Sequence, residues 1–128
     1  MALPVERWFA AIPARVSTRT FSREDIPREH GERLQAAADS LTEIMPGARA
    51  VIVAERADRV LRGSVGPCGL ITGAPAYAVF IGDTSRREVN EAIGYLGEGV
   101  ILEATSLGLA TCWVGGMFRP EAVRRVVR

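Results

Sequence analysis

Apolar residues follow helical spacing in the first third of the chain. Residues 5–12 carry their apolar side chains on one helical face, so a short opening helix is predicted, which Pro13 ends. A second helix is predicted between Asp25 and Pro46, where apolar residues recur at spacings of three and four. These residues are Leu34, Ala37, Ala38 and Leu41. The N-terminal part of the chain is therefore expected to be mainly helical.

The spacing then changes to that of strands before it returns to a helix. Residues 48–54 and 75–82 are rich in Val, Ile and aromatic residues, which predicts two strands. Residues 85–107 have apolar positions at spacings of three and four, which predicts a long amphipathic helix that ends at Gly108. This helix contains three glycines, each costing about 1 kcal/mol relative to alanine. The simplest compensation is close approach of another backbone at Gly94, Gly97 and Gly99.

The pattern near the C-terminus predicts a short third strand and a final helix. Residues 111–114 form the expected strand, and residues 120–127 form the expected helix after a Gly115-Gly116 turn. The chain has 128 residues, of which 48% are hydrophobic, enough for one domain with a substantial core.

Charge and cysteine content exclude several classes of function. Sixteen basic and fifteen acidic residues give a net charge of +1, so no overall field favours nucleic acid or an anionic membrane. No apolar run approaches the roughly 20 residues of a membrane span or forms a signal-peptide core, so a cytoplasmic location is expected. Cys68 and Cys112 lack CxxC spacing, and His30 is the only histidine. We therefore expect neither a metal site nor a disulfide framework.

The first candidate site is the segment Arg15-x-Ser17-x-Arg19-x-Phe21. In an extended stretch, two guanidinium groups and a hydroxyl at period two point to one side. Arginine matches phosphate oxygens with a planar fork, and a hydroxyl adds a short donor, so phosphate is the natural ligand. Taken alone, these residues fit a solvated basic loop better.

The second candidate site is the glycine-rich run from Gly108 to Gly116. Glycines without side chains would let a flat ligand approach backbone N–H groups directly, although tight turns use glycine for geometry alone. Within the run, Trp113 is more typical of a core or interface residue than of a stacking platform. Cys112 has apolar neighbours and is expected to be buried and unreactive.

Taken in order, these segments resemble the nitroreductase family. That family carries an R-x-S-x-R-x-F/Y segment after a short first helix, then a long helix ending in an A-x-x-x-G-L-x-x-x-W-like run and a G-G or E-G turn. The matching positions here are Arg15, Ser17, Arg19, Phe21, Ala104, Gly108, Leu109, Trp113, Gly115 and Gly116. The stretch from Gly97 to Gly116 is particularly similar to one branch of the family. The resemblance covers nearly the whole chain.

The resemblance implies a fold, a cofactor and a reaction. The fold would be a three-layer α+β arrangement with a small mixed sheet and a long central helix, in one domain over residues 1–128. FMN would bind at a homodimer interface formed around the long helix. NAD(P)H would reduce the FMN, and a nitroaromatic or quinone acceptor would then be reduced.

The resemblance also assigns roles to individual residues. Arg15 and Ser17 would bind the FMN phosphate and ribityl chain. Arg19 would lie near the pyrimidine edge of the ring, where a cation stabilises the charge that develops on reduction. The backbone N–H groups of Gly115 and Gly116 would face the reactive N5 region. Arg19, Gly115 and Gly116 are thus the expected catalytic positions.

Two departures from the family leave alternatives open. Residues 44–49 lack the asparagine of the P-S-x-x-N-x-Q-P-W-like segment, whose polar side chains touch the ring in typical members. Basic phosphate ligands near the family's C-terminus would lie beyond residue 128, so the chain is expected to be the N-terminal part of the domain. The alternatives to an active enzyme are a non-catalytic flavin-binding relative and a truncated, inactive fragment.

Overall fold

The structure is a computed structural model that describes residues 3–61 and 71–127. Cys68 lies outside the described residues. In chain order the elements are α1 (Val5–Ala11), η1 (Ile12–Ala14), α2 (Arg28–Ile44), β1 (Ala48–Val53), η2 (Ala57–Arg59), β2 (Tyr77–Gly82), α3 (Val89–Ser106) and α4 (Pro120–Val126). None of the described helices is long and apolar enough to span a bilayer.

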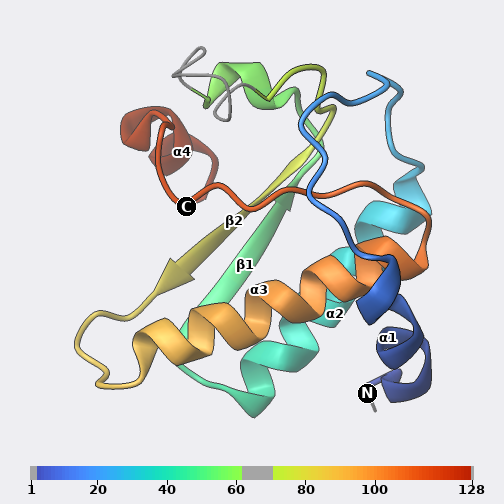
Figure 1. The fold of residues 1–128 in the computed structure, drawn as a ribbon. Coiled ribbons are helices and arrows are strands. Elements are labelled where there is room, and N and C mark those ends of the chain that lie inside the picture. Colours follow the sequence, from blue (N-terminus) through green and yellow to red (C-terminus); the bar gives the residue numbers. More distant parts are fainter. Residues whose placement is uncertain (1–2, 62–70, 128) are drawn as a thin grey trace.

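Strands β1 and β2 form an antiparallel pair, in register from Ala48 opposite Gly82 to Val53 opposite Tyr77. One face of the pair contributes Ala48, Ala50 and Phe80 to the core beneath α2 and α3. Alternation places Arg49 on the opposite face, where its guanidinium donates to the carbonyl oxygen of Val127 at 3.2 Å. Figure 1 shows α4 across the strands from α2 and α3. The α+β class is thereby confirmed, with helices on both sides of a small sheet.

The core lies between α2, α3 and the sheet. Leu41 of α2 and Leu96 of α3 are the largest fully buried side chains among the described residues. Ala37 and Ala38 are also buried, and their small size allows α2 and α3 to pack closely. Trp8 brings α1 against α3, so three helices share one apolar centre.

A buried carboxylate ties the three helices together. Glu103 of α3 is only 3% exposed. Its Oε1 accepts hydrogen bonds from Arg7 at 2.6 Å and from the indole N–H of Trp8 at 2.8 Å, both on α1. The Nε of Arg33 on α2 lies 3.6 Å from Oε2. Two cations and an indole thus compensate the desolvation of the carboxylate and fix α1 on α3.

Most of the predicted elements are present. Both strands, the opening helix, the second helix, the long helix and the final helix are confirmed, with bounds that shift by a few residues. The predicted third strand over residues 111–114 is wrong, because only Thr111 forms a β-bridge there. Strand length in a sheet depends on a partner that continues alongside, and here the paired segment diverges after one bridge.

The glycines of α3 differ from the expectation of a close backbone. A side chain at Gly97 would overlap the indole of Trp113, and one at Gly99 would overlap Leu41. At Gly94 nothing lies within 4 Å of the position a Cβ would take. Two of the glycines therefore make room for side chains rather than for a backbone, and the third faces open space.

Candidate functional site

The two candidate segments of the sequence meet in the structure. Ser17 forms a parallel β-bridge with Thr111, and the backbone N–H of Thr18 donates to the Thr111 carbonyl at 2.8 Å. The arginine segment is thus held against the glycine-rich segment that follows α3. Residues nearly a whole chain apart come to lie side by side at the C-terminal end of α3 (Figure 1).

The arginine segment is fixed at both of its ends. Helix α1 continues into η1, and the N–H of Arg15 donates to the Ala11 carbonyl at 3.0 Å before the backbone becomes extended. Further on, the N–H of Thr72 donates to Arg19 and the N–H of Phe21 donates to Thr72, both at 2.9 Å. The extended backbone puts side chains 15, 17 and 19 on one side and side chains 16 and 18 on the other.

The glycine-rich segment is also held at two points. After Thr111 it runs to Phe118, which forms an antiparallel bridge with Leu61, and the N–H of Arg119 donates to the Val60 carbonyl at 2.7 Å. The stretch between these anchors includes Gly115 and Gly116, which are exposed, and among the described residues other than their chain neighbours no atom lies within 4 Å of the Cβ position at either. A flat ligand can therefore approach the backbone there.

Arg15 has a carboxylate partner at the surface of α3. Its Nε lies 3.9 Å from Oε1 of Glu98, and the two side chains are 34% and 43% exposed. Such a long, solvated ion pair contributes little to stability, about 0–1 kcal/mol. Glu98 and Glu103 lie five residues apart on α3 and so face different partners, Arg15 and Arg7 respectively. The Arg15 guanidinium can therefore exchange Glu98 for an anionic ligand at small cost.

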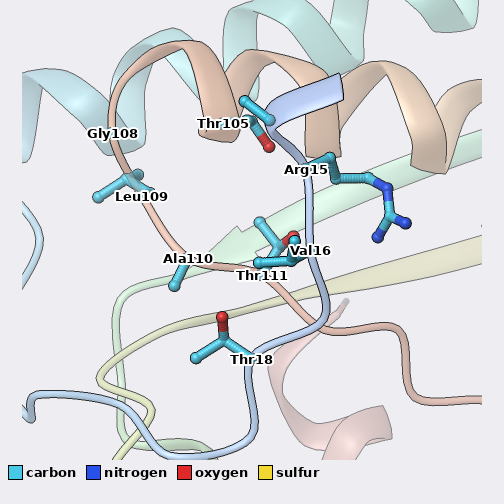
Figure 2. Close-up of a pocket in the computed structure, with 9 residues that line it drawn as sticks. Arg15, Val16, Thr18, Thr105, Gly108, Leu109, Ala110 and Thr111 are labelled. Atoms are coloured by element: carbon cyan, nitrogen blue, oxygen red, sulfur yellow. The ribbon is translucent and has the colours of Figure 1, made fainter. Parts of the chain in front are cut away.

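A cavity of about 260 Å³ lies beside the bridge between the two segments. Its lining comes from residues 14–16 and 18 on one side, and from Thr105 and residues 108–111 on the other. Figure 2 shows the Arg15 guanidinium directed away from Leu109 and Ala110. Ser17 and Arg19 do not line the cavity. The cavity is thus on the side of Val16 and Thr18, and of the two residues of the expected phosphate grip it is lined by Arg15 but not by Ser17.

The cavity has a limited capacity and was not expected from the sequence. Ligand sites of drug-sized molecules are typically about 300–1,000 Å³, so this volume would enclose only part of a flavin. Three of the residues that line the cavity are threonines, at positions 18, 105 and 111. Their separation in the sequence gives no sign that they meet in the fold. The remaining predicted residues, Ser17 and Arg19, are exposed on the other side of the segment.

Cys112 differs from its expected surroundings, and of the two settings expected for Trp113 the structure rules out the core. Trp113 is 42% exposed, and its ring packs on Gly97 and against Phe80, with centroids 5.5 Å apart. It is therefore neither a core residue nor a freely solvated one. Cys112 is half-buried rather than buried, and its sulfur lies 3.5 Å from the Trp113 carbonyl oxygen.

The architecture and the paired segments define an α+β protein of the nitroreductase type. The chain belongs to the family described as "Putative TM nitroreductase", whose model matches residues 8–128. A solved nitroreductase family protein from Clostridium difficile 630 superposes with a TM-score of 0.63 at 19% identity, covering 93% of this chain and 72% of that chain. No curated protein matches the chain. Family membership supports a general oxidoreductase role.

Proposed function

We propose that the chain is an FMN-dependent NAD(P)H oxidoreductase that reduces nitroaromatic or quinone-like acceptors. One observation carries the proposal: the Ser17–Thr111 bridge places the arginine segment beside the glycine-rich segment. Either segment alone fits an ordinary loop. Joined at Ser17 and Thr111, the two segments supply cations, a hydroxyl and open backbone N–H groups, which a phosphorylated planar cofactor requires.

The residues present fit such a cofactor on one side of the arginine segment. Arg15 and Ser17 would hold the phosphate and ribityl chain, because the Arg15 side chain has a long, replaceable ion pair with Glu98 and Ser17 is exposed. Arg19 would lie at the pyrimidine edge and stabilise negative charge there. Gly115 and Gly116 would direct backbone N–H groups at the N5 region. The flavin would supply the hydride-accepting ring, while these residues bind and orient it.

We further propose that the working form is a homodimer through α3. The outer face of α3 carries Tyr95, which is 47% exposed. Helix α1 adds an apolar surface through Val5 and Phe9, both largely exposed. Apolar side chains exposed in this way are typical of an interface. A second copy would enclose the part of the cofactor that this chain leaves in solvent.

Titration with FMN tests the cofactor assignment directly. We expect purified protein to bind FMN with a change in the visible flavin spectrum, and then to oxidise NADH or NADPH when a nitroaromatic or quinone is added. Binding without turnover would indicate the non-catalytic relative. Absence of any spectral change or binding at millimolar FMN would refute the proposal.

Two arginine variants test the individual roles. Arg15→Ala should weaken FMN binding by about 10- to 100-fold through loss of a charge-assisted phosphate contact, and should weaken riboflavin binding far less. Arg19→Ala should lower the reduction potential of bound flavin, measured by equilibration with a reference dye. Arg28→Ala is the matched control, because Arg28 is highly exposed and pairs, within the described part of the chain, with Glu32 on its own helix. Equal effects from Arg15→Ala and Arg28→Ala would remove the phosphate role.

A further inference from the structure

Trp113 occupies an unusual position for an aromatic residue of this size. It leaves 42% of its side chain exposed, while the other tryptophan, Trp8, is buried and hydrogen-bonded to Glu103. The exposed part of the indole is an apolar surface that a ligand or partner can cover. The position of the ring is therefore of functional interest.

The indole is held in place by a glycine of α3 and an aromatic side chain of β2. Its six-membered ring lies on Gly97, in the middle of α3, where any side chain would overlap it. Glycine there costs the helix about 1 kcal/mol relative to alanine. Phe80 of β2 supports the ring at a tilt of 39°. Because Gly97 leaves room for the ring and Phe80 supports it, the Trp113 indole is a pre-oriented surface instead of a mobile side chain.

Along the chain, Gly97 and Trp113 are close to residues that contact or belong to the segments expected to bind the cofactor. Glu98, which follows Gly97 on α3, is the partner of Arg15. Thr111, two residues before Trp113, is bridged to Ser17. The open Gly115-Gly116 backbone begins two residues after Trp113. Along the chain, Trp113 thus lies between Thr111, which is bridged to the arginine segment, and the open Gly115-Gly116 backbone.

We infer that Trp113 is the stacking platform for the tricyclic ring of the flavin, and that Gly97 makes room for the indole because it has no side chain. The inference rests on the proposed function, because it assigns a residue to the same cofactor. Planar aromatic ligands gain from offset contact with an indole already held in position. This contact would give the site affinity for the ring independently of the phosphate.

Flavin emission distinguishes stacking from a merely structural role. An indole or phenol in contact with an excited flavin transiently donates an electron and quenches the emission, whereas a benzene ring does not. The experiment therefore compares wild type with Trp113→Tyr, Trp113→Phe and Trp113→Leu, each titrated with FMN and with riboflavin. Bound fractions are measured by equilibrium dialysis, and emission is measured at saturation. Tyr95→Phe serves as the control for another exposed aromatic side chain on α3.

The inference predicts a specific combination of results. At saturation, flavin emission should be quenched in wild type and in Trp113→Tyr. Emission should be several-fold stronger in Trp113→Phe, whose affinity for FMN should stay within about threefold of wild type. Trp113→Leu should be bright and bind both FMN and riboflavin about tenfold more weakly, a typical effect of losing one stacked aromatic ring. Tyr95→Phe should match wild type.

Two outcomes would overturn the inference, and they are distinguishable. If wild type binds FMN but Trp113→Phe is as dark as wild type, or Trp113→Leu keeps full affinity for both ligands, Trp113 does not stack and the proposed function stands. If wild type binds no flavin, the proposed function fails and the inference fails with it. The conservative Phe and Tyr variants keep the test valid even if Trp113→Leu folds poorly.

Discussion

Two glycines of α3 allow the same substitution to be made in two different surroundings. Gly94 and Gly97 lie three residues apart in the helix interior, so replacement by alanine gives each a similar gain in helix propensity, about 1 kcal/mol. They differ in what the new methyl group meets. At Gly94 it enters open space, and at Gly97 it overlaps the far end of the Trp113 ring.

The magnitudes follow from that difference. Gly94→Ala should raise the free energy of unfolding by about 0.5–1 kcal/mol. Gly97→Ala should force Trp113 outward and lose its contact with Phe80, a cost of about 1–3 kcal/mol that outweighs the propensity gain. The two variants should therefore differ by about 2 kcal/mol, or roughly 5–10 °C in melting temperature for a domain of this size.

Thermal and urea unfolding, followed by circular dichroism at several protein concentrations, measure this difference. Tryptophan emission of Gly97→Ala should also shift to the red as the indole becomes more solvated. A double variant with Trp113→Leu should recover most of the lost stability, because the overlapping ring is then absent. If Gly97→Ala is as stable as Gly94→Ala and its emission is unchanged, Gly97 does not seat the indole.

Two further predictions concern charged groups. Glu103→Gln should lower the free energy of unfolding by about 2 kcal/mol in urea titrations, because it removes the charge that pairs with Arg7 while an acceptor remains for Trp8; unchanged stability would show that the buried ion pair contributes nothing. The hydroxyl and N–H of Ser85 hydrogen-bond to Asp83 and lower the pKa of that carboxyl. The resulting stability is present above the unfolded-state pKa of about 3.9 and is lost as the pH falls through the lower folded-state pKa. Asp83→Asn should therefore reduce the slope of stability against pH in that acid range, and an identical slope in both proteins would contradict the assignment.

The local sequence pattern was sufficient to predict the helices and the two strands of the sheet. The α2 and α3 helices follow from apolar residues at spacings of three and four, and β1 and β2 follow from runs of β-branched and aromatic residues. Both signals depend on neighbours along the chain, so they can be recognised without knowing the fold. The prediction of a third strand failed because it depended on residues far away along the chain. Residues 111–114 needed a continuous partner strand, and only one residue, Ser17, bridges to them.

The sequence by itself determined the helices and strands, the family resemblance and the identity of the two candidate segments. Only the tertiary structure decided that Ser17 lies beside Thr111, that the cavity is on the side of Val16, and that Glu103 is a buried ion-pair centre. It also decided that Gly97 accommodates an indole rather than a backbone. These features depend on contacts between residues far apart along the chain, which spacing within one element does not encode.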